Sequence, residues 1–228
     1  MIAVYLLGGA LSAVSVRAGG LLTIVEKATV DPAGINYPAP VLLSIPQFDP
    51  AKGTLVFAVV RITANFDAML LAENLGSSSA FITGSATETI EVTPPPFIYP
   101  VPLTDMAKIP PTSEPVTASD GVDAFGGTDT ATFSLTPNPK SVVLATLMFN
   151  DMDAGFGDFI GNGFLPDFEV NAFGNWAVSS NSTGAVLAKA NLLVGADIQV
   201  EYHYVPEPAT ACLVLPVLLV ACRRRRHR

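Results

Sequence analysis

The stretch TLVFAVVRITANF, residues 54–66, decides the fold class because it is dense in the β-branched and aromatic residues that favour strands. After a break predicted at Asp67, residues 68–73 resume as a strand, and residues 74–79 make a turn. Residues 198–204 alternate apolar with polar side chains, which is typical of a strand with one buried face. A helix over residues 64–75 is the weaker interpretation, since no cap begins it and its neighbours favour strand.

The remaining segments repeat this pattern of short β-rich runs separated by turn residues. Further strands are expected at residues 80–92, 130–135, 141–149, 163–173 and 185–204. Residues 93–115 are crowded with proline, which cannot donate to a central ladder, so we expect an extended loop or an edge crossing there. The sequence therefore predicts an all-β protein, an antiparallel β-sandwich flanked by an N-terminal signal segment and a short C-terminal apolar sorting helix.

The last residues combine three parts in a fixed order. They are the motif Val205-Pro206-Glu207-Pro208, the uncharged residues 209–222, and the arginines Arg223, Arg224, Arg225 and Arg226. Arginines that follow an apolar run keep its far end on the cytoplasmic side of a membrane, and so act as a cytoplasmic stop signal. At about 1.5 Å per residue, residues 209–222 give a helix of roughly 21 Å, shorter than the ~30 Å hydrocarbon core. A transient anchor is therefore favoured over the alternative of a permanent single span.

This arrangement resembles the PEP-CTERM sorting signal of envelope-bearing bacteria, on Pro206-Glu207-Pro208-Ala209 and the arginine cluster. The resemblance implies export, transient insertion in the inner membrane, and recognition by an exosortase-type membrane protease that removes the tail. The sorting and processing motif would be residues 205–208.

The other end of the chain predicts export too. Residues 2–16 form an apolar run rich in small residues, and Val16-Arg17-Ala18 has the small-x-small pattern of a signal-peptidase site. We expect cleavage between Ala18 and Gly19, although no basic residue precedes the apolar run; a start codon assigned too far downstream would account for that. The alternative is a buried first strand or helix of the body. The predicted organisation is a signal peptide at 1–18, a β-sandwich domain at 19–204, and a sorting and transmembrane tail at 205–228.

Removal of both ends changes the charge of the protein. The predicted mature stretch, residues 19–205, holds six Lys and Arg against nineteen Asp and Glu, a net charge near −13. Such a surface repels nucleic acid and anionic membranes, so neither is an expected partner.

The mature stretch offers little chemistry for catalysis. Both cysteines, Cys212 and Cys222, lie in the tail, which excludes thiol catalysis and disulfides for the body. His203 is its single histidine, whereas a catalytic zinc site normally takes two or three, and no Gly-x-Ser-x-Gly elbow supplies a nucleophile. Phosphate-loop and dinucleotide-binding motifs do not occur in the sequence. We therefore expect no enzyme.

Two acidic loops, residues 120–129 and 151–158, alternate carboxylates with glycines. Calcium takes six to eight oxygen ligands, and such a loop can wrap around one ion. The expected ligands in the second loop are Asp151, Asp153 and Asp158, and calcium is the one cofactor that the sequence suggests. The alternative is a pair of polar turns in which Asp and Gly serve the backbone geometry.

Three further stretches resemble the choice-of-anchor E domain. They are PQFDPAKGTL at 46–55 followed by Ala72-Glu73-Asn74, FIGNG at 159–163, and the final strand QVEYHY at 199–204 that runs into the sorting motif. The resemblance spans about residues 22–204 and implies an exported β-domain that is attached by varying anchors, with no catalytic residues to transfer.

Together these features predict a structural or adhesive protein of the cell envelope, the cell surface or the extracellular biofilm matrix. The expected partners are the exosortase-type protease, signal peptidase and extracellular polysaccharide. A calcium-dependent carbohydrate-binding module is the alternative, and a glycan hydrolase comes third.

Overall fold

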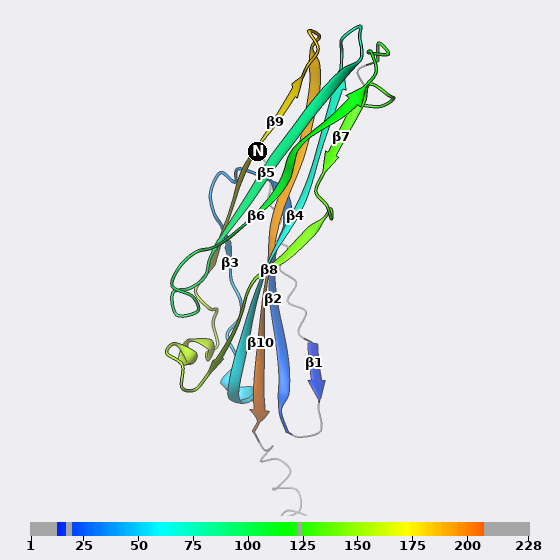
Figure 1. Ribbon diagram of the computed structural model, residues 1–228. Helices are drawn as coiled ribbons and strands as arrows, with labels where there is room; N and C mark the ends of the chain where they lie inside the picture. The colour runs from blue at the N-terminus through cyan, green and yellow to red at the C-terminus, as the bar shows by residue number, and fades with distance from the viewer. Residues whose placement is uncertain (1–12, 17–19, 123–124, 208–228) are drawn as a thin grey trace, which may run out of the picture.

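The computed structural model describes residues 13–16, 20–122 and 125–207, which form two antiparallel β-sheets (Figure 1). Ten strands and two 3-10 turns follow one another along the chain. They are β1 (Ala13–Val16), β2 (Leu22–Gly34), β3 (Val41–Leu43), η1 (Pro50–Lys52), β4 (Gly53–Asn74), β5 (Ala80–Thr93), β6 (Leu103–Val116), β7 (Thr130–Ser134), β8 (Lys140–Asn150), η2 (Phe156–Phe159), β9 (Phe168–Ser180) and β10 (Val186–Pro206). The all-β class predicted from the sequence is confirmed.

The first sheet has the order β1-β2-β10-β4-β7, and β8 also pairs with β4; the second has the order β3-β9-β5-β6. β4 and β10 pair along their whole length, from Gly53 opposite Pro206 to Asn74 opposite Val186. A strand of 22 residues at ~3.3 Å per residue extends roughly 70 Å. The body is therefore elongated (Figure 1). We call the end of this pair at Pro206 the proximal end, and the end at Asn74 the distal end.

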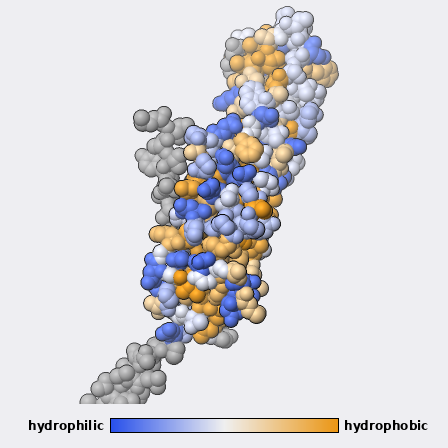
Figure 2. Space-filling view, turned by 90° about the vertical axis from the view of Figure 1, so that its left-hand side faces the viewer, coloured by the Kyte–Doolittle hydropathy of each residue, from blue (hydrophilic) through white to orange (hydrophobic). Residues whose placement is uncertain are grey.

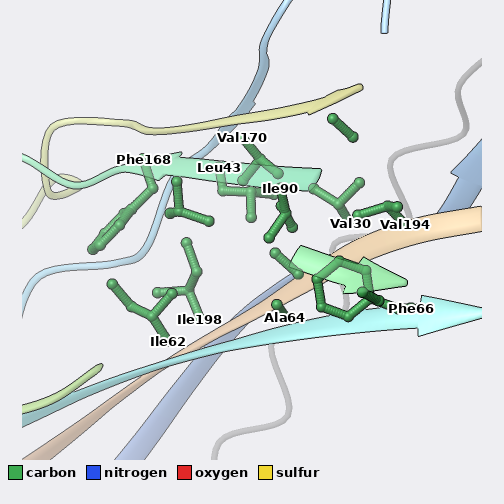
Figure 3. Close-up of a cluster of buried hydrophobic side chains, with 14 of the residues drawn as sticks. Val30, Leu43, Ile62, Ala64, Phe66, Ile90, Phe168, Val170, Val194 and Ile198 are labelled. Carbon is green, nitrogen blue, oxygen red and sulfur yellow. The ribbon is translucent and has the colours of Figure 1, made fainter. Parts of the chain in front are cut away.

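The core lies between the two sheets. Alternate residues of β4 and β5 are buried, as expected for strands that turn one face to a common interior. Ile62 and Ile198 of the first sheet and Phe168 and Val170 of the second all lie in this layer (Figure 3). On the outside, Figure 2 shows hydrophilic and hydrophobic residues interspersed along the face in view.

The predicted break at Asp67 was wrong, because β4 continues through it. What changes there is the neighbouring strand: β8 pairs with β4 up to Phe66, and β7 pairs with it from Met69. Between the two, the backbone N–H of Ala68 donates to Asn138 Oδ1 at 3.1 Å, and the N–H of Leu135 donates to the Ala68 carbonyl at 3.3 Å. The strand persists because these bonds satisfy its backbone where the ladder changes partner.

The proline-rich segment was predicted as a loop or an edge crossing, and its second half is instead the regular edge strand β6. The register with β5 shifts between Gly84 and Ala86, which face Thr112 and Ile109. Pro110 and Pro111 lie in this bulge. A bulge on an edge strand tolerates proline because no ladder hydrogen bond is lost to it.

Both predicted domain boundaries fall near the limits of the described residues. β10 continues through Val205 and Pro206, beyond the predicted boundary at 204. Ala13–Val16, inside the predicted signal peptide, forms β1 at the edge of the first sheet opposite Leu22–Val25. The cleavage site at Ala18 and Gly19 and the tail from Pro208 onward, with its predicted sorting helix, lie outside the described residues.

Candidate functional site

The predicted sorting motif begins at the proximal end of the body. Val205 and Pro206 are the last residues of β10 and lie opposite Thr54 and Gly53. Both are exposed, and so is Glu207, the last described residue. Pro208 and the arginines Arg223, Arg224, Arg225 and Arg226 lie outside the described residues. The described part of the motif is thus accessible and directly continuous with the longest strand pair.

Residues 46–55, 159–163 and 199–204, which carry most of the choice-of-anchor resemblance, meet at this end, whereas Ala72-Glu73-Asn74 lies at the distal end. The Phe48 N–H donates to the Phe159 carbonyl at 2.8 Å, and the Gly161 N–H donates back to Phe48 at 3.0 Å. The Phe48 ring lies 5.9 Å from the ring of Tyr202 and 5.1 Å from that of Tyr204. Sequence reasoning had these stretches only as separate similarities, and the structure brings them together around Phe48, through its backbone on one side and its ring on the other.

Gly161 is required by this arrangement. A Cβ at this position would lie 2.3 Å from the Gln47 side-chain oxygen. The Gln47 amide is held in place, since its Nε2 donates to the Asp158 carbonyl at 2.8 Å and its Oε1 accepts from the Gly163 N–H at 3.2 Å.

An aromatic cluster fills the core beneath the sorting motif. Phe159 is fully buried, and its ring lies 5.4 Å from Phe97, 5.1 Å from Phe149 and 6.4 Å from Tyr202. The Tyr202 hydroxyl donates to the Pro46 carbonyl at 2.7 Å. Burial, and then the nearby charge of Glu26, raise the pKa of Tyr202. Tyr202 therefore remains a neutral structural donor.

The predicted calcium ligands of the second acidic loop do not converge. Asp151, Asp153 and Asp158 are all exposed. Asp153 Oδ2 accepts from the Asn150 N–H at 2.8 Å, which closes a turn. Within the described ranges, these three carboxylates do not form a group with metal-binding spacing.

The first acidic loop contributes to a different group at the distal end. Glu73 of β4 joins Asp120 and Asp129 from the segment between β6 and β7, and one carboxylate oxygen of each lies within 4.8 Å of the others. Glu73 is fully buried and Asp129 is 1% exposed, whereas Asp120 is exposed. Sequence reasoning did not predict Glu73 as a ligand, because Glu73 lies far from the loop in the chain. Its place in the strand pattern is also typical of a solvent-facing residue.

Backbone N–H groups hold one oxygen of each of these carboxylates. Glu73 Oε2 accepts from Phe125 at 2.9 Å, Asp129 Oδ2 from Asp120 at 3.0 Å, and Asp120 Oδ1 from Val122 at 2.8 Å. Glu73 Oε1 and Asp129 Oδ1 are buried, and no group of the described residues donates to either.

Asn74 organises the loops around this group. Its fully buried amide donates to the Ser78 carbonyl at 2.8 Å and to the Thr117 carbonyl at 2.7 Å, and its Oδ1 accepts from the Gly76 N–H at 3.0 Å. Its backbone N–H donates to the Asp129 carbonyl at 2.9 Å. One side chain thus ties the end of β4 to both neighbouring loops.

His203 contacts three neighbouring side chains. Its ring stacks on Phe57, with the centroids 4.1 Å apart, and Nδ1 lies 3.0 Å from the Thr23 hydroxyl. Nε2 lies 3.5 Å from Glu201. These neighbours hold the histidine on the sheet surface. Among the described residues, Thr23 is the one hydroxyl that forms a hydrogen bond with it.

Another buried carboxyl, Glu88 on β5, lies in the core between the sheets. It is fully buried, and a hydrogen bond with the Leu193 backbone offsets only part of the cost of that burial. Burial, and then the charge of Asp67, raise the pKa of Glu88 to about 7. Its protonation therefore changes near neutral pH.

A groove of about 470 Å³ lies where β9 meets β10 and the end of β2. Its lining includes the half-exposed Trp176 and the amides of Asn36, Asn175 and Asn191, and it has no carboxylate. Aromatic faces and amides are the groups that proteins use to hold neutral polar ligands such as sugars.

Comparison with known proteins gives no relative from which to transfer a function. No family model matches the chain, and no curated protein matches it. Among solved structures, a chain from the structure of the Gx strain of infectious bursal disease virus is 10% identical in sequence. The match covers 90% of this chain and 48% of that chain, with a TM-score of 0.14. The VP2 subviral particle of that virus is 11% identical over 96% and 56%, with a TM-score of 0.12. The chain spans about half the length of these viral proteins, and such low scores carry no argument.

No helix in the described part of the chain is long and apolar enough to cross a membrane.

Proposed function

We propose that this chain is an exported structural or adhesive protein of the cell surface or extracellular matrix, sorted by its C-terminal tail. The observation that carries the proposal is the direct run of β10 into the exposed Val205-Pro206-Glu207 segment. Because β10 extends along the whole body, a tail that leaves from Pro206 would hold the distal end roughly 70 Å away from the membrane.

Two properties of the body support this role. Its predicted mature stretch is strongly acidic and free of cysteine, which suits a soluble exported domain that folds without disulfides. Its single histidine, His203, and the expected calcium ligand Asp153 are both held in structural contacts. We therefore infer a protein that displays a surface rather than one that turns over a substrate.

Mass spectrometry of the mature protein purified from its own cells tests the sorting proposal. The expected product begins near Gly19 and ends near the Pro-Glu-Pro site, after the action of signal peptidase and an exosortase-type protease. The Glu207→Ala variant should retain the C-terminal arginines, whereas Glu114→Ala, on exposed β6, should be processed normally. A finished wild-type product that still contains Arg223, Arg224, Arg225 and Arg226 would refute the proposal.

A carbohydrate-binding module is the second candidate, and the groove beside Trp176 favours it. Co-sedimentation of the mature protein with matrix polysaccharide should then weaken about tenfold in Trp176→Ala, since stacking on one aromatic ring contributes about 1–1.5 kcal/mol. Val143→Ala, at another exposed position, is the control. Repetition of the assay in EDTA separates calcium-dependent from calcium-independent binding. Unchanged binding by Trp176→Ala would mean that the groove is not the polysaccharide site.

A further inference from the structure

We propose that Glu73, Asp120 and Asp129 form a calcium site at the distal end of the body. The site differs from the one that the sequence suggested, because it joins a strand residue to the first acidic loop. It is also independent of the sorting tail, so either proposal can fail without the other.

The spacing of the three carboxylates fits a calcium ion. Calcium lies 2.3–2.6 Å from its oxygen ligands, so oxygens on opposite sides of one ion are about 4.6–5.2 Å apart. The ligand oxygens of the three carboxylates lie within 4.8 Å of one another, so a single ion can contact all three.

Two buried carboxylate oxygens of this group lack a hydrogen-bond donor within the described part of the chain. Glu73 Oε1 and Asp129 Oδ1 are inaccessible to solvent and accept no hydrogen bond from the described residues. A buried carboxylate oxygen without a partner is costly, and nearby like charges add to that cost. A divalent cation would remove both penalties, because it supplies the missing partner and neutralises the repulsion.

The three carboxylates have no cationic side chain paired with them among the described residues. The backbone N–H groups of Phe125, Asp120 and Val122 already fix the opposite oxygen of each carboxylate. The free oxygens are thus held in place before any ion binds.

Gly127 leaves room beside these oxygens. A Cβ on Gly127 would lie 3.3 Å from both Asp120 Oδ2 and Asp129 Oδ1, and the residue has a φ of 84° that favours glycine. The exposed side of Asp120 admits water, which would complete the six to eight ligands that calcium takes. Calcium tolerates an irregular arrangement of oxygen ligands, whereas magnesium demands a near-ideal octahedron.

Binding would tie the segment between β6 and β7 to the end of β4. Glu73 belongs to the longest strand, whereas Asp120 and Asp129 belong to the segment between β6 and β7. The ion would therefore stabilise the distal loops, which are the part of the body farthest from the sorting motif.

Isothermal titration calorimetry of the EDTA-treated mature protein with CaCl₂ tests the proposal. We expect one site with a Kd of about 10⁻⁴–10⁻³ M, as in extracellular calcium modules, and weaker binding of MgCl₂. Asp120→Asn, which changes an exposed side chain, should weaken calcium binding by about tenfold or more, because the site loses one of its three charges. Asp153→Asn, in the other acidic loop, is the matched control and should bind as the wild type does.

Thermal unfolding gives a second readout. Calcium at ten times its Kd should raise the wild-type Tm by a few degrees. Glu73→Gln should raise the Tm in EDTA, because it removes a buried charge, and should abolish the response to calcium. Absence of binding to the wild type, tighter binding of magnesium, or wild-type affinity in Asp120→Asn would each overturn the assignment.

Discussion

The two ends of the body are stabilised in different ways. At the proximal end, aromatic rings pack around Phe159 and Phe48, and the buried Tyr202 hydroxyl has a carbonyl partner. At the distal end, the buried groups include the carboxylates of Glu73 and Asp129, held by loop backbone. The difference shows that one continuous pair of strands can support a core of packed aromatic rings at one end and a cluster of mostly buried carboxylates at the other.

The largest expected effect tests the proximal core. Phe159→Ala should lower the free energy of unfolding by about 3–5 kcal/mol, because it removes a fully buried ring from a cluster of three others. Urea denaturation of the mature protein measures this loss. Phe164→Ala, at a side chain that is 65% exposed, is the control. Equal effects of the two substitutions would mean that the aromatic cluster is not the source of stability.

The next effect tests how the distal loops are held. Asn74→Ala should destabilise the protein by on the order of 3 kcal/mol, since it leaves the carbonyls of Ser78 and Thr117 and the Gly76 N–H without their partner. Hydrogen exchange should show faster exchange in the distal loops than at the proximal end. The exposed Asn162→Ala should change neither quantity, and uniform exchange in Asn74→Ala would contradict the proposed division of the body.

Glu88 gives a pH dependence with a definite sign. The pKa of Glu88 is about 7 in the folded protein against 4.5 for the ordinary group, so between these values the folded state binds more protons than the unfolded state. Its contribution to stability therefore falls as pH rises from about 4.5 to 7, and the loss is complete above pH 7. Glu88→Gln should raise the Tm by a few degrees at pH 8 and have little effect at pH 4.

Thermal scans between pH 4 and pH 8 measure that prediction. Glu91→Gln, a partly exposed residue on the other face of the same strand, provides the control and should leave the pH profile unchanged. If the Glu88→Gln variant shows the same pH profile as the wild type, burial does not raise the pKa of Glu88.

The smallest expected effect concerns the second acidic loop. Asp158→Asn should change stability by less than about 0.5 kcal/mol, because its side chain is exposed and only its backbone takes part in hydrogen bonds. Urea denaturation with and without calcium provides the measurement. A calcium-dependent difference would mean that this loop binds calcium too, and it would weaken the contrast between the two ends.

Local sequence pattern predicted several strands well. Residues 80–92 and 141–149 correspond closely to β5 (Ala80–Thr93) and β8 (Lys140–Asn150), since short β-rich runs bounded by turn residues specify strands without help from distant partners. β9 was expected at 163–173 and instead occupies Phe168–Ser180, because pairing with β5 extends the strand as far as Ser180. β2 was not expected, and its pairing with β10 explains why a segment with Glu26, Lys27 and Asp31 is extended.

The sequence indicated only part of the candidate calcium site. The acidic loop at 120–129 stood out by its alternation of carboxylate and glycine, yet the loop at 151–158 looked equally suitable. The two differ because a buried strand carboxylate, Glu73, lies under the first loop, whereas the second closes an exposed turn. Such a difference depends on contacts between residues far apart in the chain.

The sequence by itself determined the all-β class, the acidic body without cysteine, and the order of apolar and basic segments at the ends, because composition and short-range periodicity specify these properties. Only the tertiary structure decided that β4 runs unbroken past Asp67, that Phe48 joins three distant stretches, and that Glu73 meets Asp120 and Asp129. Each of these results depends on strand pairing over long sequence separations, and no local pattern encodes which distant backbone satisfies a given hydrogen bond or which distant charge a carboxylate will face.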